Sequence, residues 1–247
     1  PMLSKTNVKY IQSLHHKKLR QEEHCFIAEG PRIVQEFLSS GNFNCKMLCG
    51  MGEWMDVNKS VLTMVAAENI FVISEIDLGQ ISLLKTPNQV LAVFNDRDPY
   101  PIVPHRKLTL ILDDIQDPGN MGTLIRIADW FAIENIVCSP DCVECYNPKV
   151  VQASMGSLGR VNIVYTDIGL FIADHKNIEI YAASLGGREL NTFQKIKEGM
   201  IIIGNESKGI REELISLASE IITIPRAGKA DSLNAAVAAG IILSHLV

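Results

Sequence analysis

The chain has 247 residues, enough for one large domain or two small ones with a substantial core. Apolar residues make up 47% of it and charged residues 21%, which is the composition of a globular protein and excludes a disordered one. No apolar run approaches the roughly 18 residues that a membrane span needs. The N-terminal stretch also lacks the layout of a secretion signal. We therefore predict a cytoplasmic protein without a membrane partner.

Helical and strand-like segments alternate through the first 97 residues. Apolar periodicity predicts helices near residues 4–19, 31–40 and 55–66, and short strands at 25–28, 45–49, 70–73 and 90–94. This alternation is typical of a compact α/β unit, and about 95 residues is an ordinary size for a domain. The sequence therefore predicts a small N-terminal α/β domain over residues 1–97.

The first 20 residues are basic, although the whole chain carries a net charge of −5. They contain no acidic residue, and their cations are Lys5, Lys9, Lys17, Lys18 and Arg20. Because nucleic-acid binding relies on local neutralisation of phosphates, these five residues are candidate RNA contacts. The ordinary alternative, a solvated helix surface, is left open by the residues themselves.

Residues 98–107 form the predicted linker between two domains. Pro99, Pro101 and Pro104 fall within six residues of it. Proline lacks the backbone N–H that helices and sheets require, so this stretch is expected to be extended and stiff.

Beyond the linker, the sequence predicts a larger α/β domain over residues 108–247. Apolar strands are expected at 108–112, 136–137, 178–183, 200–203 and 221–224, with helices near 124–131, 148–158, 210–219 and 233–246. Nearly continuous apolar strands separated by helices are typical of a parallel sheet covered on both faces. Ligands of such sheets bind beyond the carboxyl ends of the strands.

Three polar segments follow predicted strands of this second domain. They read Asn-Met-Gly-Thr-Leu-Ile-Arg at 120–126, Gly-Asn-Glu-Ser-Lys-Gly at 204–209, and Ile-Pro-Arg-Ala-Gly from 224, running on to Ser-Leu-Asn at 232–234. The first turn from strand to helix, at 117–122, lacks the Gly-x-Gly-x-x-Gly cradle of nicotinamide enzymes. An oxidoreductase is therefore a poor alternative.

In order and separation, these segments resemble the three signature motifs of the SpoU (TrmH-type) RNA ribose 2′-O-methyltransferases of the SPOUT superfamily. Residues 146–156 are also similar to the segment that these enzymes carry between the first two motifs. The resemblance covers most of residues 108–247. It implies a C-terminal trefoil knot, which sequence periodicity could not reveal, and S-adenosylmethionine bound in the knotted loops.

The N-terminal unit, with Phe-Ile-Ala-Glu-Gly at 26–30 leading into a helix, looks like the ribosomal-protein-like RNA-binding domain of rRNA-directed members. The resemblance therefore implies 2′-O-methylation of a ribose in structured RNA, with 23S rRNA as the leading substrate. A tRNA-directed enzyme is the alternative within the same class, disfavoured because those members tend to lack such a domain.

The resemblance assigns catalytic roles to five polar residues, Asn120, Arg126, Glu206, Ser232 and Asn234. Methyl transfer to a ribose 2′-OH requires an in-line approach and loss of the hydroxyl proton. Arginine is a poor base, with an unperturbed pKa above about 12, so Arg126 suits a clamp on the adjacent phosphate that favours the alkoxide. Retention of all five argues against the other alternative, a non-catalytic RNA-binding protein with the same fold.

The family positions that contact S-adenosylmethionine match Gly204, Ile224 and Leu233. Other positions depart from the family pattern: Ser207 stands where Gly is usual, Arg226 where Met is usual, and Ala132 where Gly is often found. Arg226 adds a cation near the predicted site, so the substrate preference is less well specified than the cofactor.

Six cysteines in a chain without an export signal predict reduced thiols. Cys142 and Cys145 form a Cys-x-x-Cys pair with Cys138 four residues upstream, but the second ligand pair of a zinc site is missing. We therefore expect no metal. The closing helix is apolar along residues 233–243, more than one sheet face covers, and together with the resemblance this predicts a homodimer.

Overall fold

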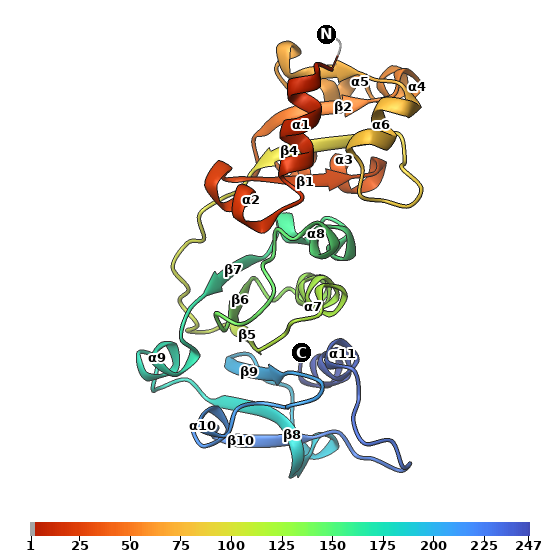
Figure 1. Ribbon diagram of the computed structural model, residues 1–247. Helices are drawn as coiled ribbons and strands as arrows, with labels where there is room; N and C mark the ends of the chain where they lie inside the picture. Colours follow the sequence, from red (N-terminus) through yellow and green to blue (C-terminus); the bar gives the residue numbers. More distant parts are fainter. Residues whose placement is uncertain (1–2) are drawn as a thin grey trace. The chain divides into compact units, whose positions relative to one another are not determined.

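A computed structural model describes residues 3–247 of the chain. The described chain divides into two compact units, which are coloured along the sequence in Figure 1. The first unit contains the N-terminal residues through Asp98 and also Tyr146–Arg160, and the second contains Pro99–Cys145 and Val161–Val247. No helix of the described residues is long and apolar enough to cross a membrane.

The first unit is built on a four-stranded sheet in the order β1-β4-β2-β3. Its strands are β1 (Cys25–Glu29), β2 (Cys45–Gly50), β3 (Ile70–Val72) and β4 (Val90–Asn95), with β4 antiparallel to both of its neighbours. Its helices are α1 (Lys5–Ser13), α2 (Lys17–Glu23), α3 (Pro31–Ser40), α4 (Gly52–Val57), α5 (Lys59–Leu62), α6 (Glu75–Ile81) and α8 (Pro148–Ser154). Short 3₁₀ turns are η1 (Ala67–Asn69) and η2 (Ser157–Gly159).

Alternating residues of these strands build two cores, one on each face of the sheet. Ile27 and Cys49 pack with Ile11 of α1 and Leu78 of α6. Phe26, the neighbour of Ile27, points to the opposite face, where its ring lies 5.5 Å from that of Phe37 in α3. Because both faces are covered, all five residues of β1 are buried.

The single helix predicted over residues 4–19 is instead two, α1 and α2. Helix α1 ends at Ser13, and the residue that caps it, Leu14, has a buried side chain that belongs to the core. The buried Arg20 then donates from Nη1 to the carbonyl oxygens of Leu14 and His15, at 2.8 and 2.9 Å. Carbonyls at a helix end need such partners, so Arg20 stabilises the break.

Residues 146–160 follow a strand of the second unit but pack within the first. The ring of Tyr146 stacks on Phe26 at 4.7 Å, and Asn42 Nδ2 donates to the carbonyl of Gly159 at 2.8 Å. Gly156 adopts φ +92°, and a Cβ there would lie 2.6 Å from the side chain of Glu36. The segment of the resemblance between the first two motifs is therefore part of the first unit.

The second unit is built on a six-stranded parallel sheet in the order β10-β8-β9-β5-β6-β7. Its strands are β5 (Leu108–Asp113), β6 (Asn135–Cys138), β7 (Asn162–Tyr165), β8 (Ile180–Glu189), β9 (Gly199–Gly204) and β10 (Glu220–Thr223). Its helices are α7 (Pro118–Trp130), α9 (Ile168–Ala173), α10 (Glu212–Ile215) and α11 (Ala235–Leu246), with a 3₁₀ turn η3 (Leu190–Thr192).

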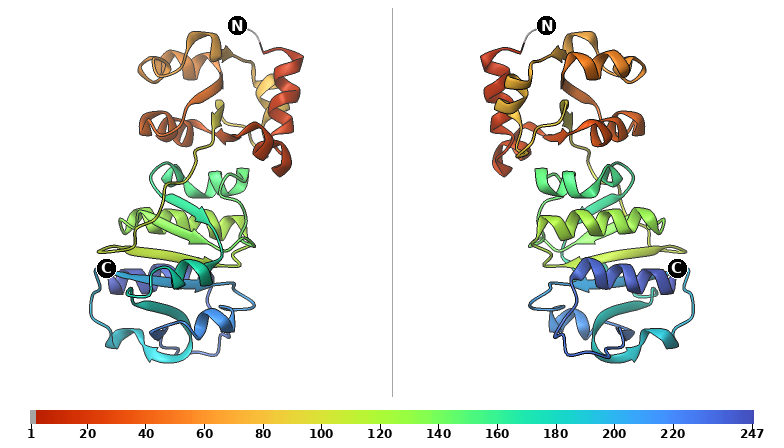
Figure 2. Two further views of the ribbon diagram at one scale, coloured as in Figure 1. Left: turned by 90° about the vertical axis from the view of Figure 1, so that its left-hand side faces the viewer. Right: turned by 90° about the vertical axis from the view of Figure 1, so that its right-hand side faces the viewer.

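Helices cover both faces of this sheet, as the sequence predicts. Figures 1 and 2 show α7 and α11 on one face and α9 and α10 on the other. The central strands β5 and β9 are almost wholly buried and pair along their full length. Strand β7 and helix α9 are not predicted by the sequence, and the helix expected near 210–219 is reduced to the four residues of α10.

The last segment returns from the sheet edge to the middle of the unit. Strand β10 lies at one end of the sheet, whereas α11 packs against α7 and β9. The backbone N–H of Ile196 donates to the carbonyl of Leu246 at 2.8 Å, which ties the C-terminus to the segment before β9.

Candidate active site

All three polar segments lie at the carboxyl edge of the parallel sheet. One follows β5 and opens α7, one follows β9, and one connects β10 to α11. Asp117 caps α7 by accepting the N–H of Asn120 at 2.8 Å, because Asp has the short acceptor that a helix N-terminus requires. A parallel sheet brings such loops together although they are far apart in the sequence.

A chain of side-chain hydrogen bonds joins the three segments. Asn120 Nδ2 donates to Glu206 Oε1, and Asn234 Nδ2 donates to Asn120 Oδ1 at 2.8 Å. The Oδ1 of Asn234 accepts the N–H groups of Ala236 and Val237 at the start of α11. These bonds fix the orientation of both amides and leave the second carboxylate oxygen of Glu206 for another donor.

A second set of contacts fastens the loop after β9 onto the end of β5. Buried Asp113 accepts both the N–H and the Nε of Arg211 at 2.9 Å. Lys208 Nζ donates to Asp114 at 2.8 Å, and this hydrogen bond lowers the pKa of the Asp114 carboxyl below its usual value. Sequence reasoning missed these acidic residues, although two aspartates ending a buried strand were a signal that could have found them.

Gly204, a predicted cofactor-binding position, lies where two stretches of backbone approach closely. A Cβ at this position would lie 2.4 Å from the backbone carbon of Gly209, because residues 205 and 209 form a bridge that closes the loop. Asn205 holds the same loop by donating to the carbonyl of Asp114 at 2.8 Å. Gly204 thus permits the tight turn that presents Glu206.

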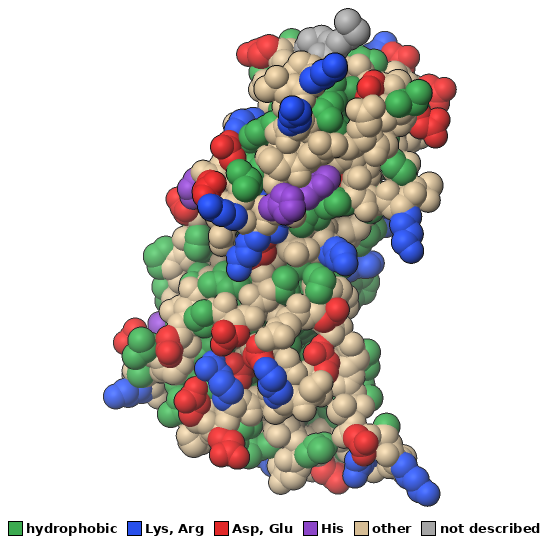
Figure 3. All heavy atoms as spheres, viewed as in Figure 1, with side chains coloured by type: hydrophobic (Ala, Val, Ile, Leu, Met, Phe, Trp, Pro, Cys, Tyr) green, Lys and Arg blue, Asp and Glu red, His purple; other side chains and the backbone are tan. Residues whose placement is uncertain are grey.

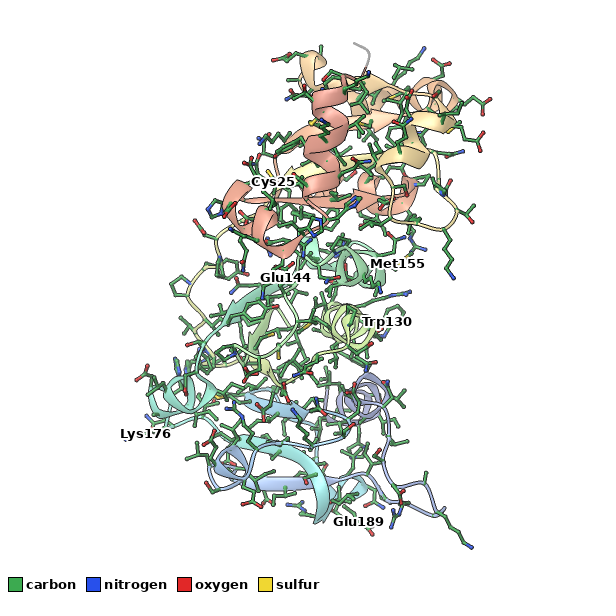
Figure 4. All side chains as sticks on the ribbon, in the orientation of Figure 1. Cys25, Trp130, Glu144, Met155, Lys176 and Glu189 are labelled. Atoms are coloured by element: carbon green, nitrogen blue, oxygen red, sulfur yellow. The ribbon has the colours of Figure 1, made fainter. Side chains whose placement is uncertain are left out.

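Arg126 is exposed, and its side chain makes no hydrogen bond or ion pair within the described residues. It lies six residues after Asn120 on α7, and at 100° per residue the two side chains diverge by roughly 120° around the helix. The structure therefore does not bring Arg126 to the Glu206–Asn120–Asn234 chain of the same molecule. Its outward arc also carries Trp130, which is 82% exposed and is labelled in Figure 4.

The remaining predicted residues of the third segment stand near its ends. Ile224 is half-buried, Ser232 is exposed, and Leu233 is 45% exposed, a large value for an apolar side chain. Leu185, which the sequence reasoning missed, is 65% exposed towards the carboxyl end of β8. Exposed apolar side chains beside an exposed loop at this edge fit a ligand with an aromatic base.

The predicted RNA contacts of the first unit divide into two kinds. Lys5, Lys9, Lys17 and Lys18 are exposed, and Lys18 pairs with Glu22 at 3.7 Å. Arg20 is only 3% exposed because its guanidinium binds the carbonyls at the end of α1. We therefore withdraw Arg20 from the predicted RNA contacts and assign it a structural role.

Within the cysteine cluster, Cys142 forms hydrogen bonds with the backbone of two other segments. Cys142 Sγ donates to the carbonyl of Leu112 and accepts the N–H of Ile115, both at 3.3 Å. It thereby ties the segment after β6 to the turn that precedes α7. No cluster of three or more His, Cys, Asp or Glu suited to a metal occurs in residues 3–247.

The second unit is similar in sequence to a known protein family. Residues 107–244 match the model of the SpoU rRNA methylase family, which is more than half of the chain. The chain belongs to this family. The predicted family is thereby confirmed, as is the fold class of a parallel-sheet α/β domain with a small N-terminal α/β domain. Residues 5–92 of this SpoU methylase also match an MRM3-like substrate-binding domain.

Relatives of this SpoU methylase match it over nearly its whole length. It is 28% identical to the 23S rRNA (guanosine(2553)-2′-O)-methyltransferase RlmP of Bacillus subtilis, covering 97% of the chain and 95% of RlmP. An AdoMet-bound rRNA methyltransferase from Sinorhizobium meliloti superposes with a TM-score of 0.88 and 30% identity, covering 99% of the chain and 95% of that protein. A TrmH-family protein from Porphyromonas gingivalis gives a TM-score of 0.84 and 34% identity, covering 99% and 98%.

Proposed function

We propose that this protein transfers the methyl group of S-adenosylmethionine to a ribose 2′-OH in rRNA, with 23S rRNA as its substrate. The observation that carries the proposal is the hydrogen-bonded chain of Glu206, Asn120 and Asn234, which links all three motif loops. The names of RlmP and of the AdoMet-bound Sinorhizobium protein support the substrate class and the cofactor. Because rRNA is the substrate, we place the protein in the cytoplasm beside ribosomes.

The free carboxylate oxygen of Glu206 is the group best suited to the ribose hydroxyl. A 2′-OH is a weak acid, so an acceptor is needed to orient it and to favour its alkoxide. Asn120 occupies one oxygen of the carboxylate and Asn234 orients Asn120, so that the other oxygen has a defined direction. Exposed Ser232 offers a further hydroxyl at the same edge.

The residues present at the carboxyl edge fit S-adenosylmethionine, which supplies a methyl group activated on a sulfonium. Leu185, Ile224 and Leu233 would provide apolar contact to its adenine, and the backbone of residues 225–233 would provide hydrogen bonds. Gly204 would act through the shape of the loop behind Glu206. Calorimetry should give one S-adenosylmethionine site per chain and no NAD binding.

We infer that the last segment threads through an earlier loop to form the trefoil knot of the family. Three contacts to residues 193–196 support this: Ile196 N–H donates to Leu246, the ring of His245 hydrogen-bonds the Phe193 carbonyl, and Lys195 Nζ donates to Val247. These contacts hold the end of α11 under the chain that precedes β9.

We further propose a homodimer formed through the open faces of α7 and α11. These helices border a groove of 410 Å³ that begins at Asn120 and Asn234 and continues along Ile127, Val237 and Ile241. Val237 is 51% and Ile241 38% exposed. A second copy related by two-fold symmetry would cover this apolar surface, and such dimers are the commonest soluble oligomers. Val237→Glu with Ile241→Glu should give a monomer by light scattering, whereas Leu217→Glu, two residues after α10, should stay dimeric.

The dimer would also explain the position of Arg126. Since Arg126 points away from the Asn120 of its own molecule, we propose that it serves the site of the partner molecule, where it holds the phosphate beside the target ribose. Arg126→Ala and Glu206→Gln proteins should each be inactive. Mixed after dissociation, they should regain about a quarter of wild-type activity, because half of the dimers would hold one intact site. If confirmed heterodimers were inactive, Arg126 would act in the active site of its own molecule.

Methyl-labelled S-adenosylmethionine tests the proposed reaction and substrate together. Incubation with total RNA followed by nuclease mapping should place the label in 23S rRNA. Label in tRNA would support the alternative substrate within the same class. Transfer to neither RNA by a folded protein that binds S-adenosylmethionine would contradict the proposal.

A further inference from the structure

The second unit is acidic, yet the proposed substrate is a polyanion. It carries 11 Lys and Arg against 17 Asp and Glu. Four of these cations already pair with carboxylates, namely Lys107, Arg188, Lys208 and Arg211. The cations best able to bind RNA phosphates are therefore those without a carboxylate partner in the described residues. Their positions indicate where RNA would bind on this unit.

Three of these unpartnered cations lie at the edge of the sheet opposite the active site: Arg106 precedes β5, Lys176 precedes β8, and Lys197 precedes β9. Lys195 also precedes β9, but its Nζ donates to Val247. Because all six strands are parallel, the residues that precede them share the amino edge. These four positions are thus remote from the loops that carry Glu206 and Asn234.

Arg226 and Lys229 differ from these, because both follow β10 at the carboxyl edge. The remaining unpartnered cation of the described residues, Arg126, lies on α7 and is proposed above to serve the partner molecule. They lie in an exposed loop, residues 225–234, which ends at Asn234 in the hydrogen-bonded chain. Arg226 Nη1 donates to the carbonyl of Ala230 at 3.0 Å, which curves the loop. Figure 3 shows basic side chains standing out at the lower right, where Figure 1 places this loop.

The charge of the cofactor argues that these two cations serve RNA. S-adenosylmethionine carries a sulfonium, an ammonium and one carboxylate, so its net charge is positive and an acidic unit favours it. Two cations on one loop would oppose that attraction. They would instead attract the phosphates of RNA, which carry one negative charge per nucleotide.

We propose that Arg226 and Lys229 bind the RNA phosphates next to the target ribose and hold the substrate at the active-site edge. This inference rests on the proposed function, since it assumes that RNA is the substrate. Arg226, with its planar group of donors, suits a bidentate phosphate contact, and Lys229 suits a simpler charge contact.

Binding of a 23S rRNA fragment at several salt concentrations tests the proposal. Arg226→Ala with Lys229→Ala should weaken binding about tenfold at low salt. The double variant should also flatten the slope of log affinity against log salt by about 1.4 to 1.8, because each lost phosphate contact removes roughly 0.7 to 0.9. S-adenosylmethionine affinity, measured by calorimetry, should change less than about threefold.

The matched control is Lys176→Ala with Lys197→Ala, which removes the same charge at the amino edge. Lys176 is labelled in Figure 4 beside α9, far from the 225–234 loop. Arg226→Lys keeps the charge and should retain the wild-type salt slope, which separates phosphate binding from a purely structural role in the loop.

Two results would overturn the proposal. One is a double variant whose RNA affinity and salt slope equal those of the control. The other is an equal or larger loss of S-adenosylmethionine affinity, which would mean that the cations hold the cofactor carboxylate. Both readouts are binding measurements, so a protein that transferred no methyl group would contradict the proposed function without deciding this inference.

Discussion

The two units differ in how their charges are arranged. The first carries 12 Lys and Arg against 11 Asp and Glu and presents exposed lysines on α1 and α2, whereas the second carries 11 against 17. A balanced unit with a basic surface suits capture of RNA, and an acidic unit suits a positively charged cofactor. The difference agrees with our proposal that the first unit captures RNA and the second transfers the methyl group, with a few cations in the second unit to guide the ribose.

The units agree in one respect, which is how they use buried charge. In the first, Glu29 accepts the N–H of Leu83 at 3.0 Å and the hydroxyl of Ser82, which fixes the loop after α6. In the second, Asp113 fixes the loop that presents Glu206. Buried charges in both units therefore order loops.

The largest expected effect is the loss of methyl transfer in Glu206→Gln. If the free carboxylate oxygen accepts the ribose hydroxyl, removal of its charge should lower the rate of methyl transfer at least about 100-fold. Affinities for S-adenosylmethionine and RNA should stay within a few-fold. Glu212→Gln, an exposed acidic residue in the first turn of α10, is the control. Rates within threefold of wild type would remove Glu206 from catalysis.

Next in size is the destabilisation expected from Arg20→Met. The buried guanidinium donates to two carbonyls at the end of α1, and their loss should lower the free energy of unfolding of the first unit by about 2 to 4 kcal/mol. In a Trp130→Phe background, fluorescence of the buried Trp54 reports on that unit alone. Lys18→Met should cost less than about 0.5 kcal/mol. Equal stability of the two variants would mean that the hydrogen bonds of Arg20 do not stabilise the first unit.

The features of the fold that the sequence predicts are those that depend on residues close together in the chain. The strands β1, β2, β4, β5 and β9 follow from local apolar runs, and the position of the motif segments follows from parallel-sheet geometry. The break before α2 depends on the side chain of Arg20, and α6 depends on a capping box between Ser74 and Asp77 that periodicity alone overlooks. The packing of residues 146–160 in the first unit depends on Tyr146 meeting Phe26, 120 positions earlier, and no local pattern contains that contact.

In the active site, too, the sequence predicts the individual residues but not the contacts between distant ones. The sequence identifies Asn120, Glu206 and Asn234 separately, but their hydrogen bonds span 86 and 114 positions. The outward direction of Arg126 follows from its angle on α7 relative to Asn120, which becomes visible only when the buried face of α7 is known.

A smaller effect, on RNA affinity, is expected from removal of the exposed lysines of the first unit. Lys5→Ala, Lys9→Ala and Lys17→Ala together should weaken RNA binding about tenfold at low salt. The salt slope should flatten by about 2 to 3 if each lysine contacts one phosphate. The control removes three cations at the amino edge of the second sheet, Arg106, Lys176 and Lys197. If both triple variants bind RNA equally well, the basic stretch is only a solvated helix surface.

The smallest effect concerns two thiols of the first unit. Burial raises the pKa of Cys45 and of Cys49 to about 12, above the ordinary 9.0. In the unfolded chain these thiols ionise near pH 9, so the stabilisation is complete well below pH 9 and is lost as the pH rises through 9 towards 12. Between pH 8 and 9 the wild type should lose about 0.7 kcal/mol more of unfolding free energy than Cys45→Ala/Cys49→Ala. Parallel pH profiles in urea unfolding would show that these thiols do not contribute.

The most direct test of the central claim is the chemical position of the transferred methyl group. Labelled 23S rRNA is digested with alkali, which cleaves only where the 2′-OH is free. The account predicts that the label appears in an alkali-resistant dinucleotide, and that wild-type protein but not Glu206→Gln produces it. Label recovered in mononucleotides would mean that a base is methylated, and it would contradict the assignment of Glu206 to a ribose hydroxyl.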